Sequence, residues 1–145
     1  MTNFKTFATW TLVLNVFIIV VAGHGVGCLG LIEIFWLPQF YGIGTEDFSL
    51  SLASSYDKTL GLAAILSLFG QIIFLFSFVA KGQDKIFWIR LCSLLLLWTG
   101  FFYLTHNLFD DSASMLGFVT GLPFFIVSII LAIKIVRKKL GRTYG

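Results

Sequence analysis

The chain has 145 residues, of which 58% are hydrophobic, 17% are aromatic and only 12% are charged. Soluble domains carry about 25% charged residues, so this composition excludes a water-soluble domain. The composition fits a protein whose outer surface faces lipid. The net charge of +3 does not indicate a nucleic-acid partner, because the basic residues flank apolar stretches and form no patch interleaved with base-reading side chains. We therefore predict one integral membrane domain over residues 1–145.

Four apolar stretches are long enough to cross the roughly 30 Å hydrocarbon layer of a bilayer. The first covers about residues 7–30. It is longer than a crossing requires, and we predict that its helix ends or breaks in the glycine cluster at residues 23–30. The other three cover about residues 59–80, 86–108 and 112–133. The expected fold is all-α: a polytopic membrane protein, built as a four transmembrane helix bundle with an outer aromatic loop between helices 1 and 2.

The charged residues predict the direction of these spans. If the N-terminus is cytoplasmic, nine of the ten basic residues fall on the inner side and six of the seven acidic residues fall outside. The inner basic residues are Lys5, Lys81, Lys85, Arg90, Lys134, Arg137, Lys138, Lys139 and Arg142. Because short cytoplasmic segments are enriched in Lys and Arg, we expect both termini in the cytoplasm and the protein in the cell (inner) membrane.

Small residues recur at spacings that let transmembrane helices approach closely. The candidate packing positions are Gly23, Gly27, Gly61, Gly70, Gly117 and Gly121. They predict contacts within the bundle, with other membrane proteins or in a homo-oligomer. Asn15 and Gln71 are polar residues near the middle of the first two spans, and we expect them to form interhelical hydrogen bonds.

Most of the side chains that could carry chemistry fall on the predicted outer side. The candidate catalytic residues are His24, Glu33, Asp57 and His106, and the same four with Asn107 and Asp110 are the candidate ligand-binding residues. Such groups could serve as acids and bases, and ionisable residues at membrane depth are candidates for function. A bis-histidine haem b between His24 and His106 is a further hypothesis. We predict no metal, because spacings such as HxxxH and ExxH do not occur.

A structural alternative applies to the acids. Asp110 and Asp111 directly precede the fourth span, where carboxylates commonly cap a helix and suit its dipole.

Three classes of function remain open. The expected one is a non-enzymatic subunit or helper of a membrane complex, which packs through its glycines and its outer loop. The second is a small transporter or channel with an outward-facing pocket lined by histidine and acids. The third is a membrane enzyme acting on a lipid-soluble substrate. The sequence contains no GxSxG motif, phosphate-binding loop or dinucleotide-binding glycine pattern that would favour a particular enzyme.

Overall fold

The computed structural model describes residues 3–22, 25–36 and 56–143, and these are mostly helical. The first part contains α1 (Asn3–Val16), β1 (Ile19–Ala22), β2 (Gly25–Cys28), α2 (Leu29–Leu31) and the π-helical turn η1 (Ile32–Trp36). The second part contains α3 (Tyr56–Phe76), α4 (Gln83–Thr105) and α5 (Ser112–Thr143).

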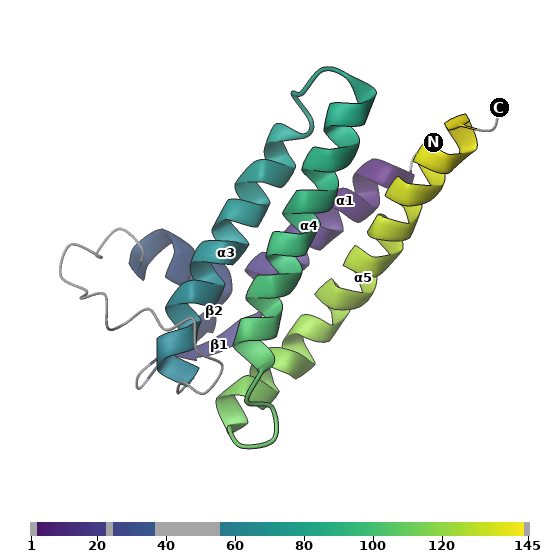
Figure 1. Cartoon of the computed structure of the whole chain (residues 1–145). Helices are drawn as coiled ribbons and strands as arrows, with labels where there is room; N and C mark the ends of the chain where they lie inside the picture. Colours follow the sequence, from purple (N-terminus) through teal and green to yellow (C-terminus); the bar gives the residue numbers. More distant parts are fainter. Residues whose placement is uncertain (1–2, 23–24, 37–55, 144–145) are drawn as a thin grey trace.

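The start of α1, the end of α5 and the turn between α3 and α4 all lie at one end of the molecule (Figure 1). We call this the basic end, because it carries Lys5, Lys81, Lys85, Arg90, Lys134, Arg137, Lys138 and Lys139. The link between α4 and α5 lies at the other end, which we call the opposite end (Figure 1).

Three helices in the described part of the chain are long and apolar enough to cross a membrane. Their apolar stretches are Thr59–Phe76, Gln83–Thr105 and Ser112–Gly141. They match the second, third and fourth predicted spans. The last helix, α5, runs through Pro123 without ending there, and it extends ten residues beyond the predicted end at residue 133. The integral membrane character expected from the composition is therefore supported by length and hydropathy.

The turn between α3 and α4 and the link between α4 and α5 are short, and each contains a residue suited to its backbone geometry. Gly82 precedes α4 with a φ of 94°, a backbone conformation that L side chains rarely adopt. At the opposite end, Asp111 Oδ1 accepts a hydrogen bond of 3.0 Å from the backbone N–H of Ala113. The cap predicted for the last helix is thus present at Asp111.

The first apolar stretch differs from our expectation. The predicted helix was to end or break at residues 23–30, but α1 ends at Val16, and a β-hairpin follows in which β1 pairs antiparallel with β2. The physical reason is local, because residues 18–21 read Ile-Ile-Val-Val, and β-branched side chains favour strands. Ile18 and Val20 are fully buried on one face of the chain.

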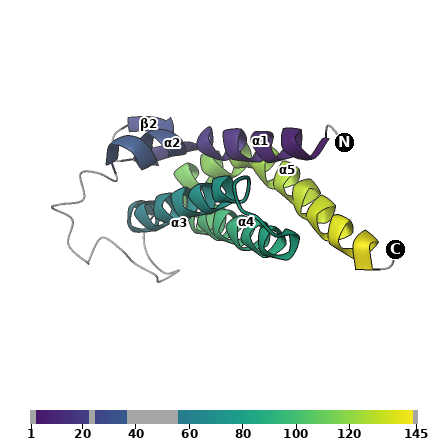
Figure 2. The same ribbon diagram turned by 90° about the horizontal axis from the view of Figure 1, so that it is seen from above.

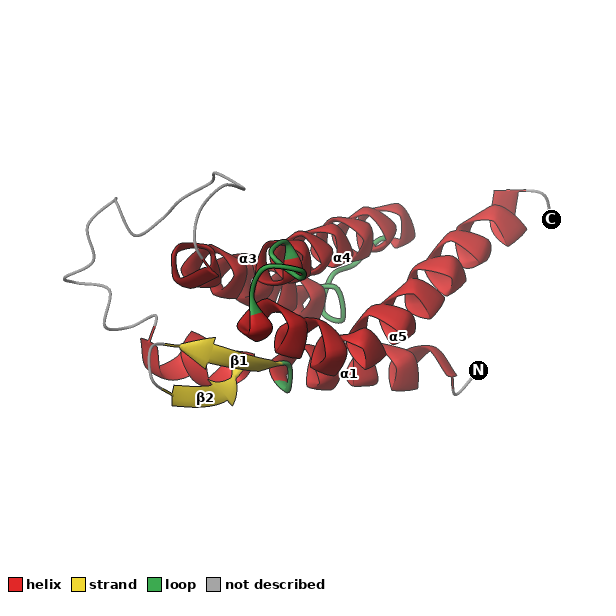
Figure 3. Cartoon of the chain, turned by 90° about the horizontal axis from the view of Figure 1, so that it is seen from below, coloured by secondary structure: helices red, strands yellow, loops and turns green. Residues whose placement is uncertain are grey.

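The packing of α1 and the hairpin explains how this irregular segment is held. At 14 residues, α1 is about 21 Å long, shorter than the hydrocarbon layer. It packs against α5, and β1 packs against α5 as well. Figures 2 and 3 show α1 and the hairpin running along one side of the molecule, with α3 and α4 as an adjacent pair on the other. The backbone N–H of Ile19 donates to Thr120 Oγ1 at 3.1 Å, and that of Leu29 donates to the carbonyl of Ile18 at 2.8 Å.

The core between α4 and α5 is aromatic. The ring of Phe101 stacks on those of Phe118 and Phe125, with centroids 6.3 and 5.6 Å away, and meets Phe124 edge-on. Between α3 and α4 the backbones themselves approach closely. A Cβ at Gly100 would lie 3.0 Å from the carbonyl oxygen of Ala63 and 3.3 Å from the backbone nitrogen of Ser67.

We predict that Gly100→Ala lowers the melting temperature in detergent micelles, because the added methyl group meets backbone atoms of α3 that cannot move aside. The matched control is Gly141→Ala, where no atom lies within 4 Å of the new Cβ. At that exposed helical position the substitution should leave stability unchanged or raise it by about 1 kcal/mol. Thermal unfolding followed by circular dichroism compares the two variants. A Gly100→Ala protein that melts as high as the control would contradict the close contact.

Candidate functional site

Four polar side chains from α1, η1 and α3 meet beside the apolar stretch Thr59–Phe76 of α3. Gln71 Nε2 donates to Asn15 Oδ1 at 2.8 Å and lies 3.1 and 3.0 Å from the two carboxylate oxygens of Glu33. Ser67 Oγ donates to the same oxygen of Asn15 at 2.5 Å. We call Asn15, Glu33, Ser67 and Gln71 the polar cluster. The interhelical hydrogen bond predicted for Asn15 and Gln71 is confirmed.

Each element brings its residue to the cluster for a local reason. Ser67 and Gln71 are four residues apart on α3 and therefore share one face of that helix. Asn15 stands in the last turn of α1, just before the backbone leaves the helix. The hairpin then reverses the chain, so that η1 returns along α3 and places Glu33 opposite Gln71.

Glu33 is buried and carries the chemistry of the cluster. Glu33 is only 6% exposed, and among the described side chains no Lys, Arg or His forms an ion pair with its carboxylate. Removing a carboxylate from water without a counter-charge is costly. The Gln71 amide offsets part of this cost. A bound proton or a bound cationic group would offset more.

A small cavity adjoins the cluster. It has a volume of about 270 Å³ and is lined by apolar side chains of α1 and α3 and by Gln71. The apolar residues are Leu12, Val13, Val16, Phe17 and Leu75. Phe17 and Leu75 are more than half exposed, so the cavity opens on the outer surface of the bundle beside α1 and α3. The arrangement offers an apolar slot with one polar wall.

The structure separates the predicted site residues. Glu33, predicted on the outer side, lies buried against the apolar stretch of α3 that holds Gln71. His106 lies at the far end of α4, where its Nδ1 is 2.9 Å from the carbonyl of Tyr103. Because a carbonyl can only accept, Nδ1 carries the proton. The buried Nε2 has no partner among the described residues.

The remaining candidates are near the opposite end or outside the described residues. Asn107 accepts backbone hydrogen bonds from Asp110 and Asp111 in the α4–α5 link, and Asp110 itself is exposed. His24 lies outside the described residues, and so does the side chain of Asp57. The haem hypothesis therefore stays a prediction. No cluster of three or more His, Cys, Asp or Glu side chains that could hold a metal occurs in the described ranges.

Three of the six candidate packing glycines serve contacts inside the chain. A Cβ at Gly70 would meet Leu97 at 2.9 Å, one at Gly117 would meet Leu104 at 3.3 Å, and one at Gly121 would meet Phe101. Gly61 is buried within α3, Gly27 has nothing within 4 Å of its Cβ position, and Gly23 lies outside the described residues.

From the sequence, Asn15 and Gln71 were predicted to form interhelical hydrogen bonds, whereas Glu33 was predicted on the outer side. Ser67 was not among the predicted site residues, and its hydroxyl within the apolar stretch of α3 is the signal that could have indicated it. Glu33 was already a candidate site residue from the sequence, since it is flanked by Leu31, Ile32 and Ile34, and an acid in such a run needs a polar partner. Comparison of the chain with models of known protein families, with curated protein sequences and with solved structures finds no match.

We predict that Gln71 and Glu33 are energetically coupled. Replacing Gln71 with Leu should destabilise the protein in detergent, and the loss should be smaller once Glu33 is already Leu, because the Gln71 amide then has no carboxylate to donate to. Interhelical hydrogen bonds in membrane proteins contribute about 0.6 kcal/mol on average and up to about 1.7 kcal/mol. A double-mutant cycle by thermal or denaturant unfolding measures the coupling. Effects that add within about 0.3 kcal/mol would show no interaction.

Proposed function

We propose that the chain is a small membrane transporter whose polar cluster binds a cationic amphiphile. Glu33 then either pairs with the protonated amine of this ligand or accepts its proton. The observation that carries this proposal is the buried carboxylate of Glu33, which has a hydrogen-bond donor but no ion-pair partner among the described side chains. An ionisable residue at membrane depth is a functional candidate by default.

The cavity supports the choice of ligand. The apolar walls suit a short hydrocarbon chain, and the described hydrogen bonds of Gln71 all use Nε2, so its Oε1 is the acceptor that this side chain offers to a ligand. A carbonyl oxygen backed by a carboxylate favours a donor with positive charge. A primary alkyl amine combines a hydrocarbon chain with a positively charged hydrogen-bond donor.

The broken first segment supports transport rather than static binding. Non-helical backbone at membrane depth is tolerated where it is buried in protein or lines a cavity. Transporters often place their binding sites at interrupted helices of this kind. Here α1 ends one residue after Asn15, beside the cavity, and the returning turn η1 supplies the carboxylate.

We further propose that α1 and the hairpin complete a fourth crossing, with the basic end in the cytoplasm. Lys5 lies in the first turn of α1, Lys81 and Lys85 lie at or next to the α3–α4 turn, and Lys138 lies near the end of α5. All four are at one end of the bundle, as the positive-inside rule requires of a cytoplasmic side. The chain must then pass from this end to the start of α3 at the opposite end.

The expectation of a non-enzymatic subunit stays a prediction. The packing contacts of Gly70, Gly117 and Gly121 lie within the chain itself, so they do not favour a partner helix. The enzyme reading also stays a prediction, and Glu33, His106 and Asp110 belong to separate parts of the structure.

We expect octylammonium to bind the wild-type protein about tenfold more tightly than it binds Glu33→Gln, because the substitution keeps the shape of the side chain and removes its charge. Octan-1-ol, with the same chain and no charge, serves as the matched control and should bind both proteins alike. Isothermal titration in detergent measures both, and uptake of radiolabelled octylamine into proteoliposomes tests transport. Equal octylammonium affinities for the two proteins would refute the site, and binding without uptake would refute the transporter.

For the orientation, we expect single cysteines at the two ends to differ in labelling. In a chain lacking Cys28 and Cys92, a membrane-impermeant maleimide should label Phe109→Cys in intact cells and Gly141→Cys only after the membrane is opened. Both positions are exposed, so accessibility depends on the side of the membrane. Labelling of Gly141→Cys in intact cells would reverse the proposed topology.

A further inference from the structure

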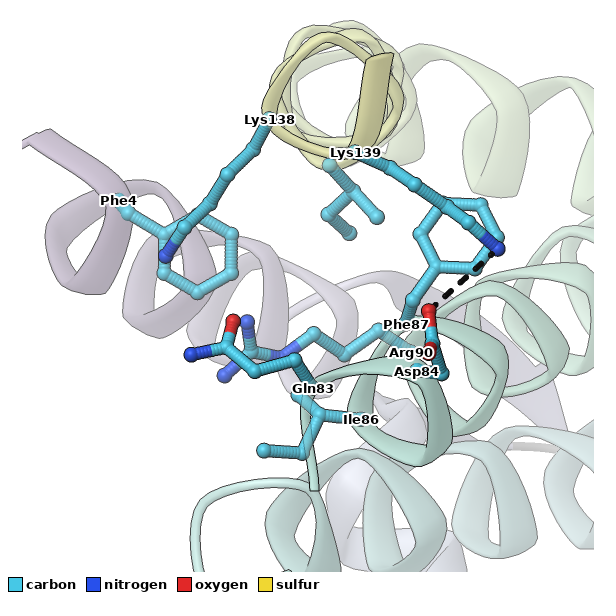
Figure 4. A pocket seen from close by; sticks show the side chains of 9 residues that line it. Phe4, Gln83, Asp84, Ile86, Phe87, Arg90, Lys138 and Lys139 are labelled. Carbon is cyan, nitrogen blue, oxygen red and sulfur yellow. Dashed lines mark ion pairs between the residues drawn. The ribbon is translucent and has the colours of Figure 1, made fainter. Parts of the chain in front are cut away.

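A second cavity lies at the basic end, between the start of α1, the start of α4 and the last turns of α5. Its volume is about 460 Å³, within the range of about 300–1,000 Å³ that is usual for small-ligand sites. Arg90, Lys138 and Lys139 line it together with Asp84, and Phe4, Phe87 and Ile135 form apolar walls. Figure 4 shows the two lysine side chains reaching from α5 past the cavity toward α1 and α4, with Arg90 on the facing side.

The charge of this lining is positive. Three cations face one carboxylate, which leaves two positive charges in excess. Lys139 Nζ lies 3.9 Å from Asp84 Oδ1, so this pair is balanced internally, whereas Arg90 and Lys138 have no carboxylate within ion-pair distance among the described residues. An anion is therefore the ligand that the electrostatics favour.

Arg90 is held in place before any ligand arrives. Its Nε donates to the buried Ser77 Oγ at 3.1 Å, and its guanidinium carbon lies 4.4 Å from the centre of the Phe4 ring. A guanidinium fixed in this way loses little freedom on binding, and its planar fork suits the oxygens of a phosphate. Lys138 Nζ lies 6.0 Å from the same Phe4 ring.

The position of the cavity indicates the kind of phosphate. Arg90 is seven residues into α4, within its apolar stretch, and Lys138 is three residues from the end of the apolar stretch of α5. Such positions lie where lipid headgroups meet the hydrocarbon layer. Basic pockets between transmembrane helices on the cytoplasmic side are suited to acidic headgroups. Trp88 and Val136 are exposed apolar side chains next in sequence to the lining residues Phe87 and Ile135, and acyl chains can lie against them.

We propose that this cavity binds the phosphate group of an anionic phospholipid of the same leaflet, with Arg90 and Lys138 as its charge partners. The site is independent of the polar cluster, with which it shares no residue. A free phosphate ion has the same charge chemistry and is distinguished below by experiment.

The test uses the full chain in a neutral detergent, titrated with dioleoyl phosphatidylglycerol or dioleoyl phosphatidylcholine, with bound lipid counted by native mass spectrometry. We expect the anionic lipid to bind the wild-type protein at least tenfold more tightly than the zwitterionic lipid. Lys138→Gln should weaken the anionic lipid about fivefold, since one basic residue near the membrane surface contributes roughly that factor. Arg90→Gln should weaken it further.

The matched control is Arg137→Gln, which removes one charge from the neighbouring, exposed position that does not line the cavity. It should change the affinity less than twofold. If Arg137→Gln and Lys138→Gln weaken binding equally, the lipid responds only to the general charge of this end, and the proposed site is wrong. Inorganic phosphate or glycerol 3-phosphate that displaces the lipid at micromolar concentration would identify a soluble phosphate as the ligand and overturn the lipid assignment. Lys138→Gln, at an exposed position, keeps the test valid if Arg90→Gln does not fold.

Discussion

The side-chain amide of Gln71 is the contact on which the arrangement of the first segment depends. An apolar layer offers no water to satisfy a broken helix, so every polar group released there needs a partner within the protein. Gln71 Nε2 supplies one partner to Asn15, at the end of α1, and another to Glu33, in η1. A single residue of α3 thereby holds both sides of the β-hairpin. Without it, the carboxylate of Glu33 would lose a donor that stabilises it away from water.

The remaining bundle provides the rigid frame for this contact. Gly100 brings the backbones of α3 and α4 together, and Gly121 of α5 leaves room for the ring of Phe101 of α4. Thr120 of α5 accepts the hydrogen bond from Ile19 and so fixes the start of the hairpin. Because α3 is held by α4, and β1 by α5, the polar cluster forms between two elements whose positions are already determined by packing.

The sequence was sufficient for the long helices and insufficient for the first segment. Uninterrupted apolar runs of about 20 residues predict α3, α4 and α5, because length and hydropathy are properties of the run itself. Residues 7–30 have the same apolar character, yet the β-branched run at 18–21 favours a strand, and only packing against α5, with the hydrogen bond from Ile19 to Thr120, establishes where that strand lies. The partner of Glu33 lies 38 positions away along the chain, and no local pattern encodes such a pairing. Similarly, Arg90 and Lys138 were interpreted only as signs of membrane orientation, since their shared cavity depends on the packing of α4 against α5.

The two cavities divide the molecule into regions of different chemistry. The acidic polar cluster lies within the apolar layer and opens sideways, whereas the basic cavity lies at the end of the bundle where the headgroups of one leaflet would lie. The most direct test of the account is a carbon–nitrogen distance measurement by magic-angle-spinning NMR on the protein in lipid bilayers. We expect dipolar transfer from Gln71 Nε2 to both Glu33 Cδ and Asn15 Cγ, with transfer from Trp98 Nε1 to Ser128 Cβ as the internal control, since Trp98 Nε1 donates to Ser128 Oγ at 2.8 Å. Transfer in the control pair without transfer from Gln71 would contradict the polar cluster.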